Sequence, residues 1–269
     1  MDAWIDKLNE VDGIKAISHH PVHPHLPMRV GGPADCWIRC STLSALREAL
    51  PLIRRKTWRI HWPFQDWLVR DGGVHGCILR LEDEFETVWR TPDYIELGSA
   101  ALWSSTTGLG RAGKELQSWP GSVGSLLCGN DIKHLRGFNF EIEWLRGQAV
   151  ETITISNKQS IELPKTAIPI KIRIFGHRKS RKGKPHGSGF AFLLDKSKEP
   201  RSILEELQLH AVRLREWKIS RSDPNRIVHT GSGNFEDVVL LQKALNQRIK
   251  QVRNTSLQFR IPIIGRKKI

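Results

Sequence analysis

Histidines cluster near the start of the chain in His19-His20-Pro21-Val22-His23-Pro24-His25. Imidazole is a common ligand of transition metals, so this tract resembles a metal-binding segment. Its prolines hold the backbone extended, and Cys36 is the nearest cysteine along the sequence. We therefore expect a surface loop here and no bound metal.

Other residue types with reactive potential give weaker patterns. Cys36 and Cys40 are four residues apart in a strand-like run, which places both on one side as buried thiols. With Cys77 and Cys128 they are too few for a disulfide framework in a chain of 269 residues. The pair of glycines at 108 and 110 is too short for a dinucleotide-binding fingerprint. The ten tryptophans either fill space in the core or, if exposed, stack on bases.

The charge of the chain is strongly basic. Lys and Arg number 42 against 28 Asp and Glu, which gives a net charge of +14. Such a field favours polyanions and also suits an enzyme that holds a diphosphate substrate. Residues 163–194 and 238–269 contain no acidic residue. These stretches are either solvated or bind RNA, DNA or another polyanion, through Arg178, Lys179, Arg181, Lys182, Lys184, Arg260, Arg266, Lys267 and Lys268.

Bulk composition is that of a globular protein. Hydrophobic residues make up 39% and charged residues 26%. No apolar run approaches the ~18 residues of a membrane span, so we expect no membrane insertion. The first residues lack the basic and apolar regions of a signal peptide, which predicts a cytoplasmic location.

Strand and helix patterns are mixed along the chain. The spacing of apolar residues predicts helices over 41–53 with Ser41 as N-cap, over 199–217, and over 234–252 with Asn234 as N-cap. Pro169 places its strand at a sheet edge or at a strand start. The sequence predicts an α+β fold with mixed sheets. The expected strands are 36–40, 58–62, 77–81, 94–97, 152–155 and 168–174.

Four segments carry a family likeness in order. They are Met28-Arg-Val-Gly-Gly-Pro-Ala-Asp35, Leu68-Val-Arg-Asp-Gly-Gly73, Trp119-Pro-Gly-Ser-Val-Gly124 followed by Asn130, and a C-terminal segment that runs from Ile227 to Gly265. The first three resemble the Ile-Gly-Gly-Pro-Ala, Leu-Val-Arg-Asp-Gly-Gly and Ile-Pro-Gly-Thr-Val-Gly motifs of the MurB family. These are the UDP-N-acetylenolpyruvoylglucosamine reductases (UDP-N-acetylmuramate dehydrogenases) of peptidoglycan synthesis.

The resemblance implies a two-part, PCMH-type FAD-binding region and a smaller C-terminal α+β domain. It places the subdomains at 15–82 and at 83–180 with the return of 255–269, and the substrate domain at 186–254. It also implies that NADPH reduces FAD, which passes hydride to an enolpyruvyl ether. The family's cofactor-binding positions are retained as Gly31, Gly32, Arg70, Asp71, Gly72, Pro120, Gly121, Ser122, Gly124 and Asn130.

One loop departs from the family. A Gly-Gly-Gly-Ser-Asn segment precedes the second motif in the family, and here Trp62-Pro-Phe-Gln-Asp-Trp67 takes its place. Pro63 has no N–H to offer to a phosphate, Trp62 and Phe64 are bulky, and Asp66 repels it. We therefore expect that the chain binds no cofactor, with FAD and NADPH as the alternative.

The family's catalytic groups are also changed. Tyr94 is followed by Ile95 where the family has a Tyr-Arg pair, and Arg260 stands near the position of a glutamate. Ser188 remains as the relic of a proton donor. These changes predict a non-catalytic protein that regulates or scaffolds cell-wall precursor enzymes, or binds a polyanion. The alternative is a divergent but active FAD- and NADPH-dependent reductase.

Overall fold

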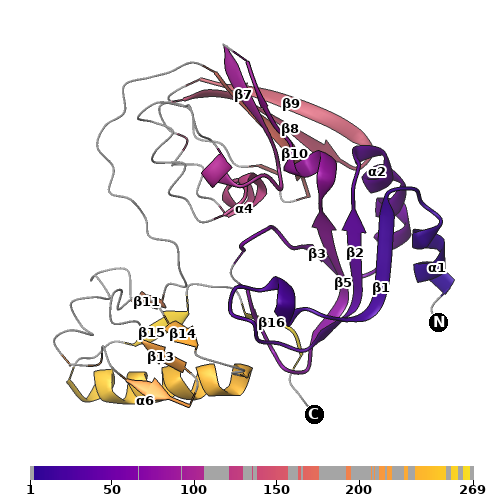
Figure 1. Cartoon of the computed structure of the whole chain (residues 1–269). Coiled ribbons are helices and arrows are strands. Elements are labelled where there is room, and N and C mark those ends of the chain that lie inside the picture. The colour runs from indigo at the N-terminus through magenta and orange to yellow at the C-terminus, as the bar shows by residue number, and fades with distance from the viewer. Residues whose placement is uncertain are drawn as a thin grey trace. The chain divides into compact units, whose positions relative to one another are not determined.

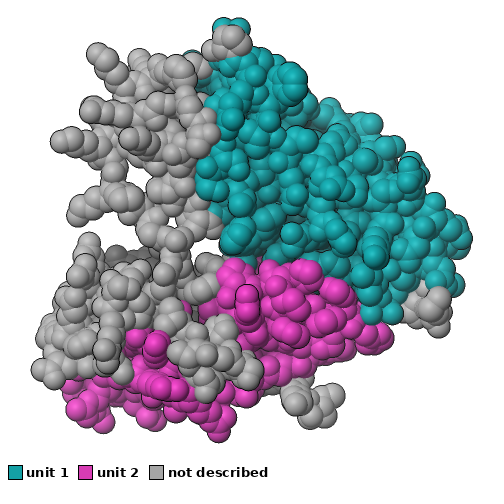
Figure 2. Space-filling view, viewed as in Figure 1, with its two compact units in different colours: residues 1–18, 36–65, 76–188 teal, residues 19–35, 66–75, 189–269 magenta. Residues whose placement is uncertain are grey.

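The computed structural model describes helices and strands in two compact units (Figure 2). Unit 1 comprises residues 1–18, 36–65 and 76–188, and unit 2 comprises 19–35, 66–75 and 189–269. These two units do not coincide with the three domains expected from the sequence. The boundaries of those three domains remain a prediction. The described residues are 3–65, 67–91, 93–105, 121–129, 135, 138–156, 163–164, 166–175, 192–194, 207, 209, 212–215, 217–219, 227–229, 234–252, 256–259 and 263–266.

A four-stranded sheet with the order β1-β2-β5-β3 forms the first part of the fold (Figure 1). Helix α2 buries Leu46 and Ile53 against Ile38 and Leu79 in one core. The expected helix and strands are present here, but Thr42 rather than Ser41 caps α2, through a hydrogen bond from Ala45 N–H. The elements are α1 (Ala3–Asn9), β1 (Ile14–Pro21), η1 (His23–His25), β2 (Pro33–Cys40), α2 (Leu43–Ile53), β3 (Trp58–Ile60) and β5 (Val74–Leu81).

A five-stranded sheet with the order β6-β7-β10-β8-β9 follows in unit 1. Helix α4 packs on one face, where Leu126 joins Ile142 and Ile172 in a second core (Figure 1). Strand β10 lies between two antiparallel neighbours, and its register shifts just after Pro169. Proline thus sits at a strand start, as expected. The elements are η2 (Asp83–Glu86), β6 (Val88–Arg90), β7 (Tyr94–Gly98), η3 (Trp103–Ser105), α4 (Val123–Cys128), β8 (Asn139–Arg146), β9 (Ala149–Ile155) and β10 (Ile168–Phe175).

Helix α6 (Phe235–Val252) organises unit 2. Its buried stripe of Val238, Leu241, Leu245 and Ile249 packs against short strands, as its spacing predicts. Asn234 caps it by accepting a hydrogen bond from Asp237 N–H at 2.9 Å, as expected. The strands are β4 (Leu68–Val69), β11 (Phe192–Leu194), β12 (Arg213–Leu214), β13 (Trp217–Ile219), β14 (Ile227–His229), β15 (Leu257–Phe259) and β16 (Ile263–Ile264).

The helix expected over 199–217 is wrong at its C-terminal end. Strands β12 and β13 pair antiparallel there, with Leu214 opposite Trp217. Arg215 has a φ of 50°, a left-handed conformation that ends any helix. Trp217 is fully buried against α6, so tertiary packing outweighs the helical spacing of this segment.

The fold class is α+β, as the sequence predicts. No helix in the described ranges is long and apolar enough to cross a membrane.

Candidate functional site

The turn Arg70–Gly73 of unit 2 carries three of the expected cofactor-binding residues. Asp71 Oδ1 accepts a hydrogen bond of 3.3 Å from Phe235 N–H, at the start of α6. The Arg70 guanidinium lies 5.1 Å from the centroid of the Phe235 ring. A carboxylate at the N-terminus of an 18-residue helix is stabilised by the helix dipole. In this chain, Arg70 and Asp71 therefore fasten α6.

The first glycine motif packs directly on this turn. Gly32 N–H donates to the Arg70 carbonyl at 3.0 Å. A Cβ on Gly32 would come within 2.1 Å of the Asp71 carbonyl oxygen, and one on Gly73 within 2.1 Å of the Pro33 carbonyl oxygen. Only glycine permits such an approach of two backbones. The structure thus brings Gly31 and Gly32 together with Arg70, Asp71 and Gly72.

In unit 1, residues Trp62–Gln65 of the loop that departs from the family form a tight turn. Gln65 N–H donates to the Trp62 carbonyl at 3.0 Å, and Gln65 Oε1 accepts from Trp62 N–H at 3.2 Å. Trp62 and Pro63 are buried, but the Phe64 side chain is 62% exposed. Phe64 has a φ of 56°, which is a rare conformation for an aromatic residue. The turn keeps the left-handed backbone that a glycine would adopt and directs the ring of Phe64 towards solvent.

The glycine-rich start of α4 lies against the same turn. A Cβ on Gly124 would come within 2.4 Å of the Trp62 ring, so the indole packs on bare backbone. Ser122 caps α4 by accepting a hydrogen bond from Ser125 N–H at 3.3 Å, and Gly124 N–H donates to the Ser99 carbonyl at 2.6 Å. The hydroxyl of Ser99 is buried and has no hydrogen-bond partner within the described part of the chain. A buried hydroxyl of this kind favours a polar ligand atom nearby.

The strained turn gives a first prediction. Phe64→Gly removes the strain of a left-handed backbone at a non-glycine residue, which is about 1–2 kcal/mol. It also raises the conformational entropy of the unfolded chain, which offsets part of this gain. We expect unfolding in urea to show a gain of about 0.5–1 kcal/mol. Phe64→Ala is the matched control, because it removes the ring but keeps a Cβ. Equal stability of the two variants would contradict strain at this position.

Several expected site residues lie outside the described residues. They are Ser188, Pro120 and Asn130, together with the basic residues Arg178, Lys179, Arg181, Lys182, Lys184, Arg260, Lys267 and Lys268. Arg266 is described, and its guanidinium is already engaged. Arg266 donates to the Gly72 carbonyl at 2.8 Å and to Asp35 at 3.0 Å, and His75 Nδ1 lies 2.8 Å from the same carboxylate.

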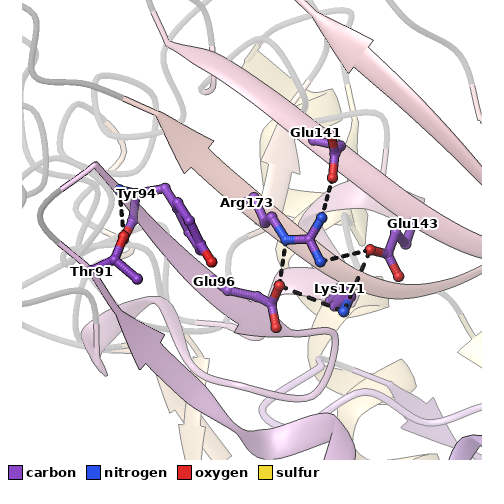
Figure 3. Close-up of polar contacts among 7 residues, drawn as sticks. All are labelled: Thr91, Tyr94, Glu96, Glu141, Glu143, Lys171 and Arg173. Carbon is purple, nitrogen blue, oxygen red and sulfur yellow. Dashed lines mark hydrogen bonds and ion pairs between the residues drawn. The ribbon is translucent and has the colours of Figure 1, made fainter.

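The acid-free stretch 163–194 is also partly neutralised by distant residues (Figure 3). Arg173 on β10 contacts Glu96 at 2.5 Å and Glu143 at 3.0 Å, and it pairs with Glu141 as well. Lys171 lies 3.5 Å from Glu96 and 3.4 Å from Glu143. Antiparallel pairing of β7 and β8 with β10 places these carboxylates directly beside the two cations. The five side chains are each less than a third exposed.

Comparison with known proteins relates the whole chain to one group of enzymes. No family model matches it. It is 23% identical to UDP-N-acetylenolpyruvoylglucosamine reductase 1 of Bacillus cereus over 99% of this chain and all of the relative, and 22% identical to the reductase of Bacillus subtilis over 98% and 99%. MurB of Thermus caldophilus has the same fold, with a TM-score of 0.68, 21% identity, and coverage of 94% of this chain and 99% of that one. The chain is thus similar to MurB reductases along its whole length and shares the MurB fold.

This similarity to MurB reductases counts against the expectation that the chain takes no cofactor, which is therefore withdrawn. That expectation rested on the bulk of Trp62 and Phe64, on the missing N–H of Pro63 and on the negative charge of Asp66, which lies outside the described residues. The turn nevertheless keeps its left-handed backbone, and Trp62 packs inward on Gly124 while Phe64 points outward. Side-chain bulk alone therefore does not measure the space left for a ligand. The unpartnered Ser99 hydroxyl beside this MurB motif is compatible with a polar cofactor.

Proposed function

We propose that this protein is a divergent FAD- and NADPH-dependent reductase of UDP-linked enolpyruvyl sugars. The observation that supports it is the alignment with two such reductases over 98% or more of both chains. Because the similarity extends over the whole length of both chains, we infer that this chain performs the reductase reaction rather than reusing a single domain for another purpose.

Each unit by itself carries family positions for a flavin. Unit 1 offers the Trp62–Gln65 turn, the Ser99 hydroxyl and the α4 segment with Gly121, Ser122 and Gly124. Unit 2 offers Gly31, Gly32 and the turn at Arg70–Gly72. Pro120 and Asn130 are further family positions and lie outside the described residues. FAD, when bound, supplies the hydride acceptor and donor.

The protein itself would hold the cofactor in place and attract the negatively charged substrate. The amide groups of Gly124 and Val123 donate to the Ser99 and Ala101 carbonyls, so they fix the backbone of the α4 motif. The Ser99 hydroxyl is left to meet a polar ligand atom. A net charge of +14 attracts a substrate that carries a diphosphate.

The test has separate binding and turnover arms. We expect the purified protein to take up FAD, with flavin absorbance that co-elutes with the protein on gel filtration. NADPH should bleach this absorbance without oxygen, and UDP-N-acetylenolpyruvoylglucosamine should restore it. Absence of flavin binding at micromolar FAD would refute the proposal.

A second candidate is a flavoprotein that binds the cell-wall precursor without reducing it. Tyr94-Ile95 in place of a Tyr-Arg pair, Arg260 near the position of a glutamate, and Ser188 without the family's nearby lysine favour this candidate. Loss of one charge-stabilising group typically costs about 10²–10³ in rate. Flavin that NADPH bleaches but the enolpyruvyl substrate does not restore would identify this case.

The only support for a polyanion-binding role comes from the basic residues in the sequence. If Arg178, Lys179, Arg181 and Lys182 bind RNA or DNA, changing all four to glutamate should abolish retention on heparin and on labelled RNA. If these charges are solvated, the melting temperature should stay nearly constant, because a solvated charge contributes little to folding. Lys171 and Arg173 provide no support for this role, since three glutamates neutralise them. A variant that binds as well as the parent would exclude the role.

A further inference from the structure

Arg266 bridges the two glycine motifs of unit 2. Its Nε donates to the Gly72 carbonyl at 2.8 Å, and its Nη2 donates to Asp35 Oδ1 at 3.0 Å. Asp35 ends the first motif, and Gly72 belongs to the second. The other oxygen of the Asp35 carboxylate lies 2.8 Å from His75 Nδ1, so this carboxylate is held from two sides. One guanidinium group therefore joins two segments that are far apart in the sequence.

Strand β16 sets the position of Arg266. It pairs parallel with β4, and Arg70 N–H, directly after β4, donates to the Ile264 carbonyl at 3.0 Å. Gly265 has a φ of 98°, and a Cβ there would lie 2.6 Å from the Gly73 carbonyl oxygen. The bare backbone of Gly265 lets Arg266 N–H donate to that same oxygen at 2.8 Å. Arg266 thus holds the glycine turn through its main chain as well as its side chain.

Three backbone N–H groups of the two motifs have no partner. Those of Gly31, Asp71 and Gly72 donate to no protein atom within the described residues. All three residues are half-buried, so a ligand from solvent has access to them. Unpaired amides in a glycine turn are typical of a site for phosphate oxygens. In the proposed function, the diphosphate of FAD is the group that would accept from them.

The carbonyls of this turn determine where its amides point. The C=O and N–H of one peptide unit point in opposite directions, because the unit is planar and trans. The Arg70 carbonyl accepts from Gly32 N–H at 3.0 Å and from Gly73 N–H at 2.9 Å, which fixes the N–H of Asp71 in the same peptide unit. The residue that follows is a glycine without a side chain to hold it, so Arg266 restrains its carbonyl.

We propose that Arg266 is a positioning residue of the flavin site. It holds the two glycine motifs in the arrangement in which their unpaired amides receive the diphosphate, and it does so without contacting the cofactor. Its guanidinium is committed to Gly72 and Asp35, so a carboxylate of the chain balances its charge. The inference rests on the proposed function, and it gives Arg266 a role other than polyanion binding.

Calorimetric titration of the flavin-free full chain with FAD, at a temperature where every variant is folded, tests this role. We expect Arg266→Met to weaken FAD binding by about tenfold, which corresponds to an ordered turn in about a tenth of the molecules. Asp35→Ala should weaken binding to a similar extent, although it removes a negative charge. The double variant should bind like either single variant, because both changes remove the same bridge.

The effect of Asp35→Ala separates positioning from direct attraction. If Arg266 paired with the phosphate itself, loss of the neighbouring carboxylate would strengthen FAD binding. Arg266→Lys keeps the charge but loses the planar fork that reaches two acceptors, so it should bind as weakly as Arg266→Met. Arg39→Met is the matched control, because its side chain is 48% exposed against 53% for Arg266 and it pairs with Glu82 in unit 1. This control should keep the affinity of the parent.

The possible outcomes are distinct for Arg266 and for the reductase proposal. A parent that binds FAD and an Arg266→Met variant that binds it equally well leave the proposed function standing and overturn the positioning role. The role is also wrong if Asp35→Ala strengthens binding or if Arg266→Lys binds like the parent, because the charge of Arg266 then acts on the cofactor directly. A parent that binds no FAD refutes the proposed function and this inference together.

Discussion

Trp62→Ala is expected to lower the free energy of unfolding by about 3–5 kcal/mol, the usual cost of truncating a buried tryptophan. The indole is 2% exposed, belongs to the first core of unit 1 and covers the backbone of Gly124, where even a Cβ has no room. Urea unfolding followed by far-UV circular dichroism measures the loss.

Phe64→Ala is the control for this prediction, because Phe64 is an aromatic residue of the same turn with 62% of its side chain exposed. It should change stability by no more than about 0.5 kcal/mol. Gly124→Ala tests the same contact by adding a methyl group against the Trp62 ring. This overpacking should lower the free energy of unfolding by about 1–3 kcal/mol. A loss below about 1 kcal/mol for Trp62→Ala would show that the indole does not fill the space next to Gly124.

Arg173→Met has the second largest expected effect. The substitution leaves Glu96, Glu141 and Glu143 with Lys171 as their remaining cation in the network. Breaking a buried ion pair from one side costs about 3–5 kcal/mol. These side chains are about a fifth to a quarter exposed, so we expect about 1–3 kcal/mol after screening by solvent.

Arg39→Met provides the comparison for Arg173→Met. Arg39 pairs with Glu82 at 2.6 Å, but its side chain is 48% exposed and it contacts one carboxylate. Its loss should cost no more than about 1 kcal/mol. The difference between the two variants should shrink when Glu141 and Glu143 are both changed to glutamine, since the uncompensated charge is then gone. Equal costs for Arg39→Met and Arg173→Met would contradict a cooperative network.

Local patterns were sufficient for much of the fold. The apolar stripe of α6, its cap Asn234 and the alternation along β10 follow from residues close together in the sequence, because helix and strand periods are local properties. The order of the glycine motifs predicted the similarity to MurB reductases that the comparisons confirm. The helix predicted over 199–217 was wrong at its C-terminal end, because the burial of Trp217 against α6 depends on residues that are distant in sequence.

Tertiary structure decided the roles of the residues around the candidate site. Arg70 and Asp71 keep the family motif, but only the fold shows that they anchor Phe235 at the start of α6. The direction of Phe64 depends on a backbone conformation that bulk and polarity do not reveal.

By itself the sequence determined the α+β fold class, the MurB resemblance and a net charge of +14. The distribution of that charge was decided by the tertiary structure. Lys171 and Arg173 lie in an acid-free stretch, yet strand pairing places Glu96, Glu141 and Glu143 against them, and Asp35 reaches Arg266. Electrostatic energy depends on distance in space, and a strand brings its partners within about 5 Å however far apart they are in sequence.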